Sequence, residues 1–174
     1  PLKAFREGVN TFLPYDIAIK EVREMPADFH ARFSARGKWY RYTIYRGEVR
    51  SPLVARSAWY RRGNLDLSLM RTAAEILIGQ HDFKAFRSSS CVAKTTVREI
   101  FSIDVSTNDE FIYVDVRGSG FLKNMVRMIV GTLVDVGQGR RPVEDVAILI
   151  AGTDKMVCGQ TAPACGLCLQ QVWY

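Results

Sequence analysis

The sequence predicts an α+β domain with a mainly antiparallel sheet and helices packed on one face of that sheet. Three observations support this fold class. Apolar and polar side chains alternate at residues 38–46, 97–105, 111–116 and 167–173, as in half-buried strands. Helical spacing of apolar residues occurs at 1–12, 66–79, 121–136 and 142–150. The turn Asn108-Asp109-Glu110 joins two of the strands directly, which predicts an antiparallel hairpin.

The individual elements have recognisable start and stop signals. Leu2, Phe5 and Val9 have near-helical spacing behind Pro1, and residues 17–22 resemble a short strand. Asp66 is a suitable N-cap for the helix that follows it, and Gly79 can end that helix. The segment His81-Asp82-Phe83 then predicts a turn with a local side-chain cap.

The composition is that of a globular protein with a moderately basic surface. The chain has 174 residues, of which 48% are hydrophobic, and this content excludes intrinsic disorder. No run of about 18 uncharged apolar residues occurs, so we expect no membrane span. The net charge of +6 is compatible with a polyanionic partner.

Four cysteines raise the question of a metal site. Cys165 and Cys168 form a CxxC pair, Cys158 precedes them, and Cys91 lies far away. One such pair supplies only half of a tetrahedral zinc site, and no second pair follows. We therefore expect no bound metal, although a metal-binding interaction domain remains an alternative.

The segment Met125–Val134 is apolar nearly all round, so its helix should be buried, yet it contains the charged Arg127. A buried guanidinium needs an anionic or carbonyl partner. Asp135 is too far along the same helix, so the partner must come from another segment or another molecule. A structural ion pair with one of three aspartates is equally compatible with the spacing: Asp82, Asp104 or Asp115. Gly131 on this helix should allow another element to approach closely.

The predicted strand Lys38–Arg46 mixes cations with aromatic side chains. Cations neutralise phosphates and aromatic rings stack on unpaired bases, so this strand could face RNA. A twisted sheet with one solvated face explains the same pattern. Gly118-Ser119-Gly120 is better explained as a tight strand-to-helix turn than as a phosphate cradle.

Several segments taken together resemble one known family, and they occur in order over essentially the whole chain. They are Asp28-Phe29-His30-Ala31-Arg32-Phe33-Ser34-Ala35, Lys38-x-Tyr40-x-Tyr42, Gly79-x-His81-Asp82-Phe83, Lys94-x-x-x-Arg98, Gly118-x-Gly120-Phe121-x-x-Asn124-Met125-Val126-Arg127 and Thr161-Ala162-Pro163-Ala164-x-Gly166-Leu167. In these motifs the chain resembles the TruA family of tRNA pseudouridine synthases.

The resemblance implies a pseudouridine synthase-like fold and an activity on RNA. The expected reaction is the isomerisation of uridine to pseudouridine at positions 38 to 40 of the tRNA anticodon stem-loop, without a cofactor, after the base is flipped out. The expected partners are tRNA and a second copy in a homodimer, and the expected location is the cytoplasm. By motif, Tyr40 corresponds to the tyrosine that stacks on the target base, and Arg127 to the arginine that pairs with the catalytic aspartate. Supporting RNA contacts are expected from three cations: Lys38, Arg36 and Lys123.

One motif of the family is missing. The nucleophilic aspartate lies in Arg-Thr-Asp-x-Gly-Val-His, which does not occur in these 174 residues. We therefore expect residues 1–22 to be a remnant of an N-terminal domain and residues 23–174 to form the C-terminal domain of such an enzyme. We also expect this polypeptide alone to make no pseudouridine. A non-catalytic RNA-binding module is the alternative function.

Overall fold

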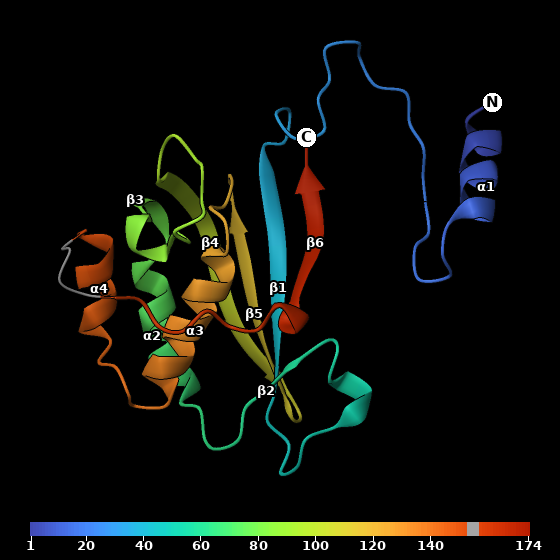
Figure 1. The fold of residues 1–174 in the computed structure, drawn as a ribbon. Helices are drawn as coiled ribbons and strands as arrows, with labels where there is room; N and C mark the ends of the chain where they lie inside the picture. The colour runs from blue at the N-terminus through green and yellow to red at the C-terminus, as the bar shows by residue number, and fades with distance from the viewer. Residues whose placement is uncertain (153–156) are drawn as a thin grey trace. The chain divides into compact units, whose positions relative to one another are not determined.

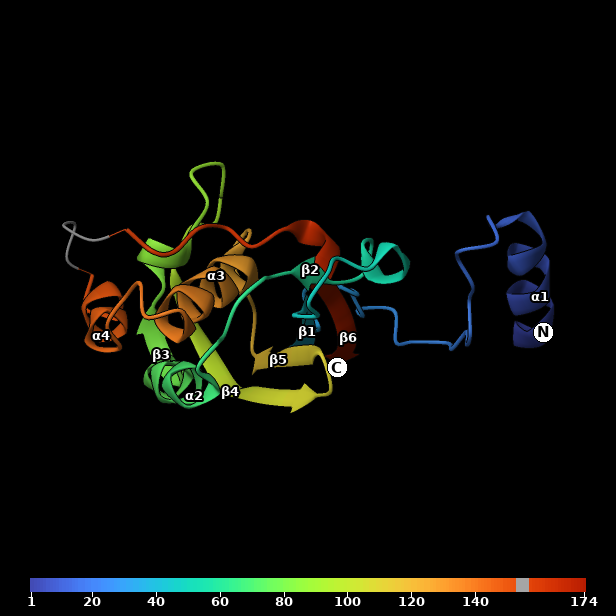
Figure 2. The same ribbon diagram turned by 90° about the horizontal axis from the view of Figure 1, so that it is seen from below.

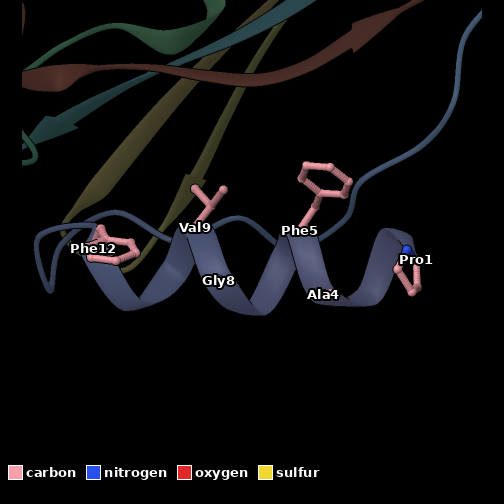
Figure 3. A pocket seen from close by; sticks show the side chains of 6 residues that line it. All are labelled: Pro1, Ala4, Phe5, Gly8, Val9 and Phe12. Carbon is pink, nitrogen blue, oxygen red and sulfur yellow. The ribbon is translucent and has the colours of Figure 1, made fainter.

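The computed structural model describes residues 1–152 and 157–174, which form two compact units, residues 1–34 and 35–174 (Figure 1). The first unit contains helix α1 (Leu2–Phe12), as predicted. Apolar side chains, among them Phe5, Val9 and Phe12, share one exposed face of this helix and line an open groove of about 350 Å³ (Figure 3). The domain boundary expected between residues 22 and 23 stays a prediction.

The strand predicted at residues 17–22 was wrong. The backbone N–H and C=O of Ile19 bond to the side chain of Asn10, at 2.7 and 2.9 Å. A strand needs a neighbour to satisfy its backbone, and residues 1–34, all of which are described, offer none. The segment therefore folds back onto the side chain of α1 instead.

The second unit is built on a six-stranded sheet, and the predicted α+β fold class is confirmed. The strands β2, β1, β5, β4 and β3 follow one another across the sheet, and β6 pairs with β1 beside β2. All pairings are antiparallel except that of β1 with β2. The strand bounds are β1 (Gly37–Tyr45), β2 (Trp59–Tyr60), β3 (Gly79–Asp82), β4 (Val97–Asn108), β5 (Phe111–Gly118) and β6 (Leu167–Trp173).

Helices cover one face of this sheet. They are α2 (Leu67–Ile76), α3 (Met125–Gly137) and α4 (Glu144–Ile150), and Figure 1 shows them gathered on the same side. Fully buried side chains from α3, such as Ile129 and Leu133, join Tyr42 and Ile44 of β1 in a single apolar core. Alternate residues of the strands, such as Trp39, are half-buried on the opposite face.

The start of one helix and the type of one element differ most from the predictions. The third helix begins at Met125 rather than Phe121, because Asn124 adopts a left-handed conformation (φ 64°) that interrupts a helix. The turn predicted at His81-Asp82-Phe83 was wrong for its first two residues, which end strand β3 (Gly79–Asp82), since β4 offers this strand a backbone partner. Asp82 nevertheless accepts a local bond from the Lys84 backbone N–H, at 3.0 Å. The predicted cap of α2 is confirmed, with Asp66 accepting from the N–H groups of Ser68 and Leu69.

Candidate active site

A pocket of about 220 Å³ lies between β1 and the start of α3. Tyr40 enters it from β1, and Arg127 enters it from the first turn of α3. The sequence places these two residues 87 positions apart (127 − 40), and the fold brings them to the same cavity. Phe121, Lys123 and Leu167 also line it. The pocket thus combines a cation with aromatic and aliphatic walls.

The ring of Tyr40 is half-buried and held by an aromatic contact. It packs nearly perpendicular to the ring of Phe121, with 5.4 Å between the ring centroids and 86° between the ring planes. Partial burial raises the pKa of the Tyr40 hydroxyl, so this group keeps its proton at neutral pH. The ring is therefore a neutral wall of the pocket.

Among the described residues, Arg127 is held in place by two neutral acceptors. Its Nε–H donates to the carbonyl of Ala162 at 2.6 Å, and its Nη1 donates to Oδ1 of Asn124 at 3.0 Å. A guanidinium has five N–H donors, and within residues 1–152 and 157–174 two of them are used and three remain. Three donors are enough for a bidentate carboxylate. The side chain is half-buried, rather than fully buried as the helix pattern predicted.

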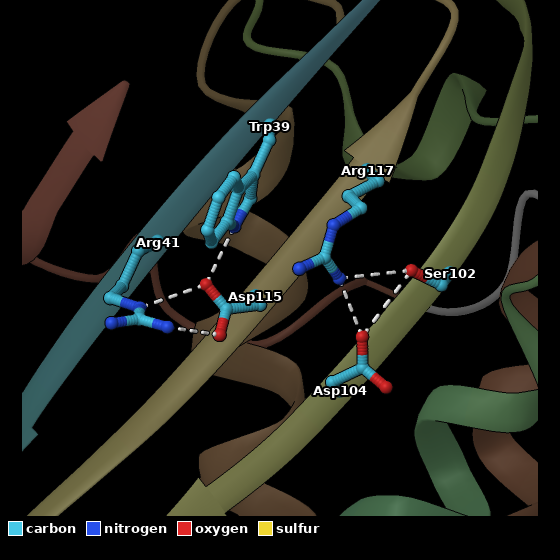
Figure 4. Close-up of polar contacts among 6 residues, drawn as sticks. All are labelled: Trp39, Arg41, Ser102, Asp104, Asp115 and Arg117. Carbon is cyan, nitrogen blue, oxygen red and sulfur yellow. Dashed lines mark hydrogen bonds and ion pairs between the residues drawn. The ribbon is translucent and has the colours of Figure 1, made fainter. Parts of the chain in front are cut away.

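The three aspartates considered as partners of Arg127 are engaged elsewhere. Asp115 accepts from Nε and Nη2 of Arg41 and from the indole of Trp39 (Figure 4). Asp104 pairs with Arg117 at 2.6 Å, and Asp82 accepts a hydrogen bond from the backbone N–H of Lys84. Within residues 1–152 and 157–174, no carboxylate forms a salt bridge with Arg127. The structural ion pair left open by the sequence is therefore not the one that forms.

Of the other three predicted RNA contacts, the structure places one at the pocket. Lys123 is exposed and lines it together with Tyr40 and Arg127. Lys38 lies two residues before Tyr40 on β1 and is half-buried. Arg36 is exposed and lines a separate groove of about 430 Å³, with Arg117 and Trp173. The fold thus joins Lys123 to the pocket and leaves Arg36 outside it.

Sequence reasoning missed two groups that shape the site. Asn124 anchors Nη1 of Arg127, and the signal for it was the residue type, because asparagine tolerates the left-handed conformation better than most residues. The carbonyl of Ala162 anchors Nε. A backbone carbonyl has no signature in residue type, so only the fold could reveal it.

Nothing in the described part of the chain forms a metal centre. The residues in these ranges include no group of three or more His, Cys, Asp or Glu side chains that could hold an ion. Cys165 and Cys168 are both exposed, and each donates weakly to a backbone carbonyl. Among the described helices, none has the length and apolar character needed to cross a bilayer.

Comparisons with known proteins point to one family. The profile of a family described as tRNA pseudouridine synthase matches residues 73–174. A protein of Syntrophotalea carbinolica named tRNA pseudouridine synthase A is 60% identical over 174 residues, which are 100% of this chain and 69% of that relative. A protein of the same name from Geobacter sp. strain M21 is 54% identical, and the match covers 100% of this chain and 71% of that protein.

Proposed function

Because the chain belongs to the tRNA pseudouridine synthase family, we propose that its pocket receives a uridine of tRNA against Tyr40 and an aspartate against Arg127. The observation that carries this proposal is the state of Arg127. It is fixed by two neutral acceptors beside an aromatic ring, and three of its N–H donors have no partner in the part of the chain that the structure describes. An isolated charge in this state is costly unless an anion completes it.

The chemistry assigns a task to each side of the pocket. Pseudouridine formation breaks the bond between N1 and C1′ of uridine and forms one between C5 and C1′. C5 releases a proton and N1 gains one, so the reaction needs no redox cofactor. A nucleophilic aspartate must be ionised, and an adjacent guanidinium lowers the pKa of a carboxylate. Arg127 would supply this effect, while stacking on Tyr40 would hold the flipped base.

The aspartate must come from outside these 174 residues, because the family's Arg-Thr-Asp-x-Gly-Val-His motif does not occur in them. The substrate that the resemblance favours is the anticodon stem-loop at positions 38 to 40 of tRNA. Lys123 at the pocket and the net charge of +6 support a polyanionic ligand. We further propose that the enzyme is a homodimer and acts in the cytoplasm.

Release of tritium from C5 of labelled uridine in an anticodon stem-loop RNA tests this function. The first sample is the chain itself. The second is an extended enzyme, in which the chain is joined to the part of the Syntrophotalea carbinolica relative that lies outside the match. We expect no release from the chain alone and release from the extended enzyme. Release by the chain alone would contradict the proposal.

Paired variants of the extended enzyme then test the two residues. Tyr40→Ala and Arg127→Met should each abolish most of the release. Two matched controls remove the same side-chain groups outside the pocket: Tyr60→Ala and Arg62→Met. Both should retain tritium release. If the chain binds the RNA tightly but every extended enzyme is inactive, a non-catalytic RNA-binding module becomes the better account.

A further inference from the structure

An extended segment, residues 157–163, crosses α3 on its way to β6, and we call it the strap (Figures 1 and 2). The strap meets Arg127 at one residue, Ala162, through two bonds. The Ala162 N–H donates to the backbone carbonyl of residue 127 at 3.2 Å, and the Ala162 carbonyl accepts from the Arg127 Nε–H. Residue 127 is therefore clamped by its backbone and its side chain at once.

The strap lies so close to α3 that only glycine fits at the crossing. A Cβ built at Gly131 would lie 1.7 Å from the carbonyl oxygen of Gln160. A Cβ at Gly159 would lie 2.7 Å from the backbone of Thr132, whose hydroxyl accepts from the Gly159 N–H at 2.9 Å. The close approach that Gly131 predicted is confirmed. This close approach fixes the distance between the strap and α3, and therefore the position of Ala162 relative to the helix.

A second attachment ties the strap to the sheet. Tyr42 is fully buried on β1, and its hydroxyl donates to the carbonyl of Pro163 at 2.7 Å. Burial raises the pKa of this hydroxyl, so it keeps the proton that it donates. Proline fixes its own φ, so an anchor on the Pro163 carbonyl also restrains the carbonyl of the preceding residue. That residue is Ala162, the acceptor for Arg127.

We propose that Tyr42 is a positioning residue for the reaction. Its hydroxyl fixes the end of the strap, the strap presents the Ala162 carbonyl, and this carbonyl directs the guanidinium of Arg127 toward the pocket. Tyr40 and Tyr42 lie on the same face of β1, so one strand supplies both the wall of the pocket and the anchor of its cation. This inference rests on the proposed function of Arg127.

The hydrogen on Nε of Arg127 reports the clamp directly. The 174-residue chain is labelled with nitrogen-15 arginine, and NMR measures the exchange of the Arg127 Nε hydrogen with water. The signal is assigned by its loss in Arg127→Lys. Tyr42→Phe keeps the ring and removes only the bond to Pro163. We expect exchange to become about five- to tenfold faster, the size of effect that one lost hydrogen bond gives.

The matched control is Tyr45→Phe. Tyr45 is also buried on β1, and its hydroxyl donates to Glu110 at 2.9 Å, away from the strap. Both variants lose one tyrosine hydroxyl bond, so a merely structural role would affect them equally. We expect Tyr45→Phe to leave the Arg127 exchange rate within about twofold. An unchanged rate in Tyr42→Phe, or equal changes in both variants, would overturn the proposal.

A second variant acts on the strap from the other side. Gly131→Ala must displace the Gln160 carbonyl, and we expect it to accelerate the same exchange. If Gly131→Ala does not fold, the comparison of the two tyrosine variants decides alone. The outcome is separable from that of the proposed function. Arg127→Met without effect on tritium release would refute the function, whereas an exchange rate insensitive to Tyr42 would refute only the clamp.

Discussion

Arg41 and Arg127 are two guanidinium groups of one folded unit with different surroundings. Arg41 donates hydrogen bonds to both carboxylate oxygens of Asp115, at 2.9 and 2.8 Å, and its guanidinium lies over the ring of Tyr113. Arg127 is bonded to a backbone carbonyl and to a side-chain amide. Among the described residues, the first charge is neutralised by a carboxylate, and the second is only oriented by neutral acceptors.

The difference shows what each group is for. Asp115 is almost fully buried and satisfies Arg41 and Trp39 together, so this cluster serves the fold (Figure 4). Neutral acceptors give Arg127 direction but leave much of its charge uncompensated, which costs stability. Groups that are costly to the fold are common at functional sites. The contrast predicts that changes at Arg127 and at Asp115 affect different properties.

The largest expected effect is on catalysis by Arg127→Met in the extended enzyme. We expect kcat/KM for the stem-loop RNA to fall about 1,000-fold, because the carboxylate loses its ion pair in the transition state. The free energy of unfolding of the chain, measured in urea, should change by less than about 1 kcal/mol, since lost hydrogen bonds are offset by removal of an uncompensated charge. A sharp loss of stability would show that this chain already neutralises Arg127.

The reverse pattern is expected for Asp115→Asn. This change leaves Arg41 without its counter-charge, and we expect unfolding to become easier by about 2 kcal/mol. The value lies below the range for fully buried pairs because the Arg41 side chain is 36% exposed and can be hydrated. Turnover per folded molecule of the extended enzyme should stay within about twofold. A fall in turnover as large as that of Arg127→Met would contradict the assignment of Arg41 and Asp115 to stability alone.

A smaller effect is expected on RNA affinity from Lys123→Gln. Lys123 is exposed beside the pocket, so we expect it to contact a phosphate rather than a base. Binding of the stem-loop RNA to the chain should weaken, and the slope of log affinity against log salt should fall by about 1. The same substitution at Lys20, which does not line the pocket, is the control. An unchanged slope would place the phosphate backbone away from this end of α3.

The smallest effect is a loss of stability at alkaline pH. Burial raises the pKa of Tyr42 in the folded chain, so its contribution to stability is fully present below the pKa of an unfolded tyrosine, about 10. Above that pH the unfolded state releases a proton that the folded state keeps, so stability declines. Between about pH 9 and about pH 11, wild type should lose about 1 kcal/mol more than Tyr42→Phe. Equal losses in urea unfolding would contradict the burial of this hydroxyl.

Much of the fold follows from periodicity. The hairpin of β4 and β5 was predicted from alternation, because one face of each strand is buried and the other is not. The last strand β6 was predicted in the same way, although none of its residues is fully buried. The strand predicted at 17–22 rested on its apolar residues, but the segment has no strand partner among the described residues, and pairing is a property of the whole fold. The turn predicted at His81-Asp82-Phe83 was wrong for the opposite reason. Strand β4 supplies residues 79–82 with a backbone partner that the local sequence does not indicate.

The site was predictable where it depends on side-chain type. A single charge in an apolar helix pointed to Arg127, and the family motif pointed to Tyr40. The sequence left open whether Asp82, Asp104 or Asp115 was the partner, and only tertiary contacts could show that all three are engaged elsewhere. The strap was unpredictable for the same reason, because its contact with Arg127 is made by the backbone of Ala162.

The most direct test of the unneutralised guanidinium is a titration of the chain with acetate. Acetate carries the carboxylate that the pocket is expected to receive, and the NMR resonances of the guanidinium carbons report its binding. With sodium chloride as the control for ionic strength, we predict a saturable shift at Arg127 and none at Arg41, which Asp115 already occupies. No saturable shift at Arg127, or equal shifts at both arginines, would contradict the account.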